Sequence, residues 1–175
     1  MKANEMLLKY VNRDNGHQKQ IGRYWASTLN DIIKGYLKPK DYFKKREIDQ
    51  QGCENITMGQ AMEELWLKIF QANNADCRYQ DKKELEIGKD ITLVVKPDFN
   101  FKSLIIEMKC PDKPMPNIIP TKWQFQLEAE YQAFKKPVYL GVIRKHPLLT
   151  LIPYKPDDIL WEEIKEKVLN FHHQL

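Results

Sequence analysis

The chain has 175 residues, of which 42% are hydrophobic and 30% charged, with 28 Lys and Arg against 24 Asp and Glu. A chain of this length can bury a continuous core, and its apolar fraction is too high for a disordered protein. No segment approaches the roughly 18 uncharged apolar residues of a membrane span, and the N-terminal stretch is too charged for a signal peptide. The composition predicts a cytoplasmic protein, whose net charge of +4 permits a nucleic-acid partner.

The first part of the chain is predicted to be helical. Apolar residues in the segment 18–36 recur at helical spacing. A basic loop with aromatic residues follows over 38–46, which composition alone assigns to a solvated surface. A second helix is expected over 55–72, with Thr57 as its N-cap.

The rest of the chain changes to β periodicity interrupted by two helices. The turn sequence IGKD is typical of a hairpin between the first two strands, and a proline-rich loop follows the third. The resulting order, α, α, β, β, β, α, β, β, α, indicates an α/β or α+β fold with a mixed central sheet flanked by helices. We expect strands over 79–87, 90–96, 103–109, 137–144 and 148–154, and helices over 121–136 and 157–172.

The segment KPDFNFKSLIIEMKCP contains the residues that indicate chemistry. Asp98 comes just after one apolar strand, and Glu107 and Lys109 lie near the end of the next. Because side chains alternate along a strand, Glu107 and Lys109 share one face and Met108 points to the other. If the two strands are antiparallel neighbours, Asp98 lies opposite Glu107.

Two carboxylates and an ammonium group then meet at the edge of an apolar sheet. Such charges are costly to bury unless they are paired or bind a metal. One interpretation is an ion-pair network at a strand end. The other is a site for Mg²⁺, which prefers oxygen ligands, with the lysine orienting or deprotonating a water or stabilising phosphate charge.

These residues resemble the PD-(D/E)XK nuclease signature, with Pro97-Asp98 as its PD and Glu107-Met108-Lys109 as its ExK. The surrounding order of helix, strand, PD, strand, ExK and helix is similar to the αβββαβ core of the restriction-endonuclease-like superfamily. The resemblance implies that fold, with an N-terminal helical part over 1–55, a nuclease core over 56–155 and a C-terminal helix over 157–173, in a single nuclease domain over 1–175.

Further segments resemble the RecB-like branch of that superfamily. Residues 23–29, RYWASTL, are similar to its S-x-L opening segment, and residues 59–64, GQAMEE, to its G-x-x-x-H-E helix. Gln126-Leu127 is similar to its Q-L-x-x-Y motif. Here Glu63 replaces the family histidine, which keeps an oxygen ligand for Mg²⁺ or Mn²⁺.

The two imperfect motifs leave alternatives. Helical geometry places Glu63 at the edge of the buried stripe and Glu64 on the opposite side, so Glu63 is the expected ligand; a boundary glutamate without metal is the alternative. Gln126 and Glu130 share a helix face and could together reach phosphate or order Lys109. Tyr131 replaces the family tyrosine one position late, and either packs in the core or contacts nucleic acid.

The resemblance implies a Mg²⁺- or Mn²⁺-dependent deoxyribonuclease that leaves 5′-phosphate ends. The implied catalytic residues are Asp98, Glu107, Lys109 and Gln126, and the implied metal ligands are Glu63, Asp98, Glu107 and the Met108 carbonyl. We expect nucleic-acid contacts from Lys44, Lys45, Arg46 and Tyr131, with further basic pairs at Lys135–Lys136 and Arg144–Lys145 and stacking by Trp25, Tyr42 and Phe43.

Some members of that branch carry an iron–sulfur cluster, which needs four cysteines. This chain has three scattered ones, Cys53, Cys77 and Cys110, so no cluster and no disulfide framework are expected. An exonuclease of the RecB-like kind is the first hypothesis, with DNA as partner and any helicase or recombination partner on a separate chain. A junction-resolvase type of endonuclease and a catalytically silent nucleic-acid-binding module are the alternatives.

Overall fold

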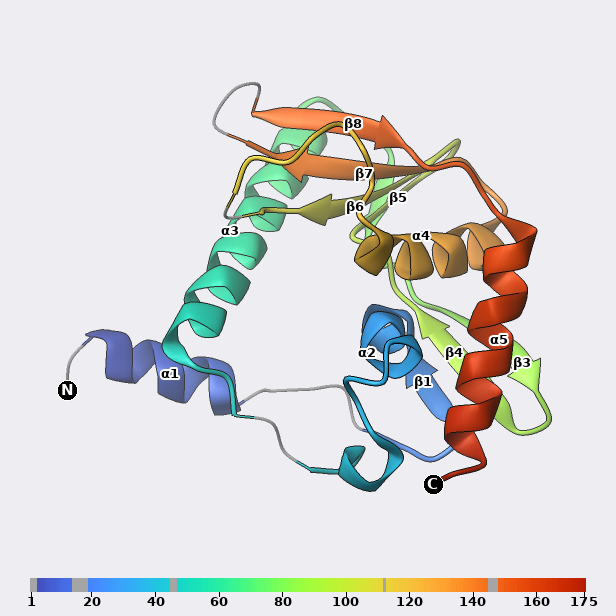
Figure 1. Ribbon diagram of the computed structural model, residues 1–175. Coiled ribbons are helices and arrows are strands. Elements are labelled where there is room, and N and C mark those ends of the chain that lie inside the picture. The colour runs from blue at the N-terminus through green and yellow to red at the C-terminus, as the bar shows by residue number, and fades with distance from the viewer. Residues whose placement is uncertain (1–2, 14–18, 45–46, 112, 145–147) are drawn as a thin grey trace.

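Helices and strands alternate along the chain of the computed structural model, which describes residues 3–13, 19–44, 47–111, 113–144 and 148–175 (Figure 1). The helices are α1 (Ala3–Arg13), α2 (Leu29–Ile33), α3 (Gln50–Ala72), α4 (Thr121–Phe134) and α5 (Asp158–His172). The strands are β1 (Arg23–Trp25), β2 (Cys77–Tyr79), β3 (Lys83–Gly88), β4 (Ile91–Val95), β5 (Phe99–Phe101), β6 (Ile105–Lys109), β7 (Val138–Ile143) and β8 (Leu149–Pro153). None of the described helices is both long and apolar enough to cross a membrane.

The strands form two mixed sheets instead of the one central sheet expected. β1, β4 and β3 form the smaller sheet in that order, and β2, β5, β6, β7 and β8 form the larger one. The chain passes from one sheet to the other at Pro97, which follows β4 and has no amide hydrogen with which to continue a ladder. The predicted α/β class with flanking helices is confirmed, and the single sheet is corrected to two.

Helices cover both faces of the larger sheet (Figure 1). Ile106 and Met108 of β6 belong to a cluster with α3 side chains such as Trp66 and Phe70. Ile105, on the other face of the same strand, belongs to the main cluster, which includes buried residues of α2, α4 and α5. The alternation predicted for β6 is therefore confirmed, and Met108 points away from Glu107 and Lys109.

The register around β6 fixes where the charged residues meet. β5 runs antiparallel to β6, with Phe99 opposite Ile106. One step further along this register, Asp98 lies opposite Glu107, as predicted. The partner strand is the short β5, however, and not the strand before Asp98, because β4 belongs to the other sheet.

The N-terminal part differs most from the sequence-based prediction. Residues 23–25 are a strand that pairs in parallel with β4 and buries Tyr24 completely, so only Leu29–Ile33 of the predicted 18–36 helix is α-helical. α3 begins at Gln50, where Asp49 caps it by accepting a bond from the Gly52 amide. Thr57 is an interior residue of α3 that bonds to the Cys53 carbonyl, so its predicted capping role is wrong.

Buried Glu128 fixes α4 against the start of α5. Its carboxylate accepts hydrogen bonds from Gln132 Nε2 at 2.8 Å, Tyr154 OH at 2.7 Å and the Asp157 amide at 2.9 Å. Because residues two apart on a helix point in nearly opposite directions, this anchor turns Gln126 and Glu130 toward β6.

Gly141 of β7 lies beside β6 at a point where the sheet has no room for a side chain. A methyl carbon there would lie 2.5 Å from Met108 Sδ and 2.8 Å from Ile106 Cγ2. Gly141→Ala should therefore lower the free energy of unfolding by about 1–3 kcal/mol in urea denaturation. Gly59→Ala is the control, since a methyl there meets nothing within 4 Å; a Gly141→Ala variant as stable as that control would contradict the packing described.

Candidate active site

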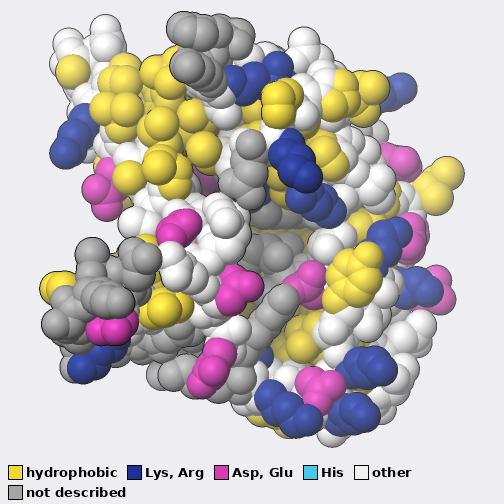
Figure 2. Space-filling view, turned by 60° about the vertical axis from the view of Figure 1, so that its left-hand side comes forward, with side chains coloured by type: hydrophobic (Ala, Val, Ile, Leu, Met, Phe, Trp, Pro, Cys, Tyr) yellow, Lys and Arg dark blue, Asp and Glu magenta, His cyan; other side chains and the backbone are white. Residues whose placement is uncertain are grey.

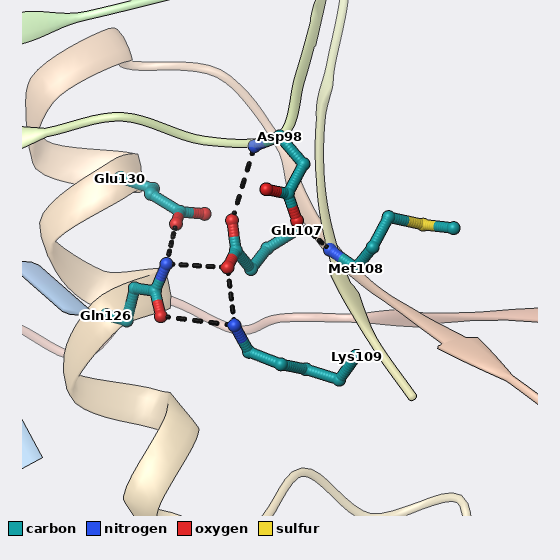
Figure 3. Close-up of polar contacts among 6 residues, drawn as sticks. All are labelled: Asp98, Glu107, Met108, Lys109, Gln126 and Glu130. Atoms are coloured by element: carbon teal, nitrogen blue, oxygen red, sulfur yellow. Dashed lines mark hydrogen bonds and ion pairs between the residues drawn. The ribbon is translucent and has the colours of Figure 1, made fainter. Parts of the chain in front are cut away.

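Asp98 and Glu107 form a pair of carboxylates at β6, the central strand of the larger sheet (Figure 3). They are only 9% and 3% exposed. The Asp98 amide donates to Glu107 Oε2 at 3.3 Å, and the Met108 amide donates to Asp98 Oδ2 at 2.7 Å. Each residue of the pair is thus held by the strand that carries the other.

Lys109 and Gln126 complete the contacts of Glu107. Lys109 Nζ lies 2.5 Å from Glu107 Oε1, and Gln126 Nε2 donates to the same oxygen at 2.6 Å. Gln126 Nε2 also donates to Glu130 Oε1 at 3.0 Å, and Gln126 Oε1 accepts from Lys109 at 3.4 Å (Figure 3). The predicted shared face of Gln126 and Glu130 is confirmed, and from it Gln126 contacts Lys109.

Glu63 brings a third carboxylate from α3. It is half-buried and accepts a hydrogen bond from Tyr79 OH at 3.1 Å, whereas Glu64 is exposed. Glu63 lines the same cavity as Asp98 and Glu107, and Glu64 does not. The helical geometry that favoured Glu63 over Glu64 thus agrees with where the two side chains lie.

The cavity has a volume of about 720 Å³ and joins segments that are distant in sequence. Residues of α3 line one wall and residues 25–27 another, so segments 23–29 and 59–64 of the sequence meet at the carboxylates. On the face that Figure 2 presents, Asp and Glu side chains lie both near the middle and toward the edges, whereas most Lys and Arg side chains lie toward the edges. The lining includes Trp25, Ser27, Gly59, Glu63, Gln80, Lys96, Asp98, Glu107, Lys109 and Gln126.

Burial and mutual repulsion govern the charges of this site. Burial, and next the charge of Glu107, raise the pKa of Asp98 and of Glu130 well above the usual carboxyl range. The same two causes raise the pKa of Glu63. Burial alone would lower the pKa of Lys109, but the charges of Glu107 and Asp98 raise it overall, so Lys109 is an ammonium ion.

The donor set fits a hard divalent cation. Three carboxylates that repel one another around one cavity are the oxygen ligands that Mg²⁺ prefers. In the described part of the chain, no three His, Cys, Asp or Glu side chains are already grouped to hold a metal ion. Asp98 and Glu107 instead accept hydrogen bonds from backbone amides, and Glu107 also accepts one from Lys109.

Other predicted residues lie away from the cavity or outside the described part of the chain. Lys44 is exposed and pairs with Asp41 at 2.6 Å, and Lys45 and Arg46 lie outside the described residues. Tyr131 packs against the main core beside Lys135. Tyr42 is 3% exposed and its hydroxyl bonds to the Arg23 carbonyl, so the predicted stacking of Tyr42 on bases is wrong.

The sequence-based prediction missed three residues of the site. Tyr79, Gln80 and Lys96 form a chain of hydrogen bonds that ends at Glu63. The prediction placed Tyr79 at a strand start and Lys96 at a strand end, each without a role. The position of Lys96 directly before the PD pair is the signal that could have drawn attention to it.

Glu130 provides a test of these electrostatics. Because its pKa is raised above its ordinary value of 4.5, wild type should lose stability as the pH rises above that value. Glu130→Gln removes this loss and keeps an acceptor for Gln126. With a metal chelator present, the free energy of unfolding of Glu130→Gln should therefore rise relative to that of wild type from about pH 4.5 upward. The rise should be about 1.4 kcal/mol per pH unit at most. A difference that does not change with pH in denaturant titrations would contradict this assignment.

The comparisons with known proteins concern the fold. No protein-family model and no curated protein sequence matches the chain. Among solved structures, the protein SSO0001 superposes with a TM-score of 0.68 and 14% identity, over 97% of this chain and 87% of the other. The alkaline exonuclease LHK-Exo from Laribacter hongkongensis superposes with a TM-score of 0.57 and 15% identity, over 97% of this chain and 91% of the other.

A phage-related exonuclease from Haemophilus somnus 129PT gives a TM-score of 0.52 with 15% identity, over 87% of this chain and 92% of that one. Identities this low establish likeness of fold. The chain therefore has a restriction-endonuclease-like fold similar to that of these exonucleases, and its Asp98, Glu107 and Lys109 come together within that fold.

Proposed function

We propose that the protein is a metal-dependent nuclease that hydrolyses phosphodiester bonds in DNA. The observation that carries this proposal is the convergence of Asp98, Glu107 and Lys109 with Glu63 on one cavity. The likeness of fold to exonucleases supports it. Buried carboxylates that repel one another contribute little to stability, and a bound cation would compensate their negative charge.

Glu63, Asp98 and Glu107 are the side chains that would hold Mg²⁺ or Mn²⁺, with the Met108 carbonyl as a further oxygen ligand. A bound divalent cation supplies Lewis acidity at the phosphoryl group and neutralises its charge. Lys109, an ammonium ion at the cavity wall, orients the attacking water and stabilises the negative charge that develops on phosphate. Gln126 positions Lys109 and Glu107 from α4.

The charge balance of the cavity explains how an acidic site accepts DNA. Its charged lining consists of Glu63, Asp98 and Glu107 against Lys96 and Lys109. With ionised carboxylates this lining has a net negative charge, which a divalent cation reverses. Binding of the phosphate backbone thus depends on the cation.

The RecB-like kind of exonuclease is the form of this activity that we favour. Two features support it. Glu63 of α3 lines the cavity at the position of the family histidine, and Gln126 of α4 bonds to Glu107 of the ExK motif. Trp25, which lines the cavity, offers a surface on which a base can stack, and Lys44 to Arg46 would contact the backbone outside it.

Removing the central residues tests the nuclease proposal. Asp98→Ala and Lys109→Ala should each lower the rate of DNA cleavage with Mg²⁺ by at least about 100-fold, since each removes a group that acts on the transition state. Single- and double-stranded substrates with blocked and free ends, followed on gels, also separate exonuclease from endonuclease activity. Equal cleavage by wild type and both variants would refute the proposal.

Glu63 and Glu64 provide a matched pair on one helix. Glu63→Gln should weaken Mn²⁺ binding in calorimetry by about 10-fold or more, and Glu64→Gln, whose side chain is exposed, should leave it unchanged. Asp98→Asn should remove the site. DNA binding that needs no divalent ion, with no Mn²⁺ site that Asp98→Asn removes, would instead identify a binding module without turnover.

A further inference from the structure

A chain of three hydrogen bonds runs from Lys96 to Glu63. Lys96 Nζ donates to Gln80 Oε1, Gln80 Nε2 donates to Tyr79 OH, and Tyr79 OH donates to Glu63 Oε2, each at 3.1 Å. Its first, second and last members line the cavity that holds Asp98 and Glu107. The chain therefore connects the end of β4 with the carboxylate of α3 across the site.

The chemistry of its two ends gives this chain one direction. An ammonium group can only donate hydrogen bonds, and an ionised carboxylate can only accept them. The amide oxygen of Gln80 must then face Lys96 and its nitrogen must face Tyr79. The single hydroxyl hydrogen of Tyr79 is left to point at Glu63, and successive donors polarise one another in the same sense.

The backbone holds the middle of the chain in place. Tyr79 pairs with Phe99 in the β2–β5 ladder, and their rings lie 5.6 Å apart. Gln80 has a φ of 52°, a left-handed conformation that residues with side chains rarely adopt. Its amide donates to the Asp98 carbonyl at 2.9 Å. The strand pairing that places Asp98 therefore also places the Tyr79 hydroxyl.

Of the three carboxylates, Glu63 is the one whose orientation depends on this hydrogen-bond chain. Asp98 and Glu107 lie on adjoining segments of one sheet and hold each other through backbone amides. Glu63 comes from a helix and has three side-chain torsions to order, which costs conformational entropy. A hydroxyl fixed to the sheet removes that freedom before a cation binds.

We propose that Tyr79 is a positioning residue which, held by Gln80 and Lys96, orients Glu63 toward Asp98 and Glu107 for cation binding. This inference rests on the proposed function, because it assumes that the three carboxylates share a cation. It assigns Tyr79, Gln80 and Lys96 a role in metal affinity.

Tyr154 provides a matched control within the same chain. Its hydroxyl donates to the buried carboxylate of Glu128 at 2.7 Å, on the side of α4 that faces away from β6. Tyr79→Phe and Tyr154→Phe each remove one hydroxyl from a tyrosine–glutamate pair and keep the ring. In Tyr154→Phe, Glu128 keeps its hydrogen bonds from Gln132 and the Asp157 amide, so α4 stays anchored. Calorimetry with Mn²⁺ on the full chain should therefore show about 10-fold weaker binding for Tyr79→Phe and unchanged binding for Tyr154→Phe.

A double-mutant cycle separates positioning from general damage. In a Glu63→Gln background, Tyr79→Phe should cause no further loss of Mn²⁺ affinity, and in the wild-type background its loss of cleavage should be restored by raising the Mn²⁺ concentration. Tyr79→Phe binding Mn²⁺ like wild type, or losing affinity equally in both backgrounds, would overturn the inference and leave the proposed function standing. If wild type shows no Mn²⁺ site that Asp98→Asn removes, both the inference and the proposed function are overturned.

Discussion

The buried carboxylate of Glu107 is the constraint on which the rest of the site depends. Its two oxygens accept hydrogen bonds from the Asp98 amide, Lys109 and Gln126. These donors come from the segment before β5, from β6 and from α4, respectively. A carboxylate that is 3% exposed would be costly without these partners. The antiparallel β5–β6 register and the Glu128 anchor of α4 keep these partners within reach of Glu107.

The fold places this group where chemistry is possible. The chain leaves the smaller sheet at Pro97, and Asp98 enters the larger one at the position opposite Glu107. α3 covers the other face of that sheet through apolar residues and carries Glu63 to its edge. Three separate segments thus contribute carboxylates. A divalent cation bound among these carboxylates would relieve their mutual repulsion. The likeness to exonucleases at 15–16% identity concerns this framework, whereas the proposed activity depends on the side chains themselves.

Local patterns predicted the centre of the site well. Alternation along one apolar strand placed Glu107 and Lys109 together, and the helical repeat separated Glu63 from Glu64. The same patterns failed where long-range pairing decided the outcome. Residues 23–25 lie within a helical spacing of apolar residues but form a strand, because β4 offers them a parallel partner. Tyr79 and Lys96 meet through Gln80 only after two sheets have formed, so no local spacing could reveal their connection to Glu63.

The central claim is that Glu63, Asp98 and Glu107 hold one or two divalent cations between them. Anomalous diffraction from crystals grown with Mn²⁺ tests this claim most directly, because it locates the ion without relying on activity. The account predicts an anomalous peak in the cavity with oxygens of Asp98 and Glu107 within about 2.0–2.3 Å and with Glu63 as a direct or water-mediated ligand. Mn²⁺ bound elsewhere in a protein that cleaves DNA, with Lys109 still paired to Glu107 in that structure, would contradict it.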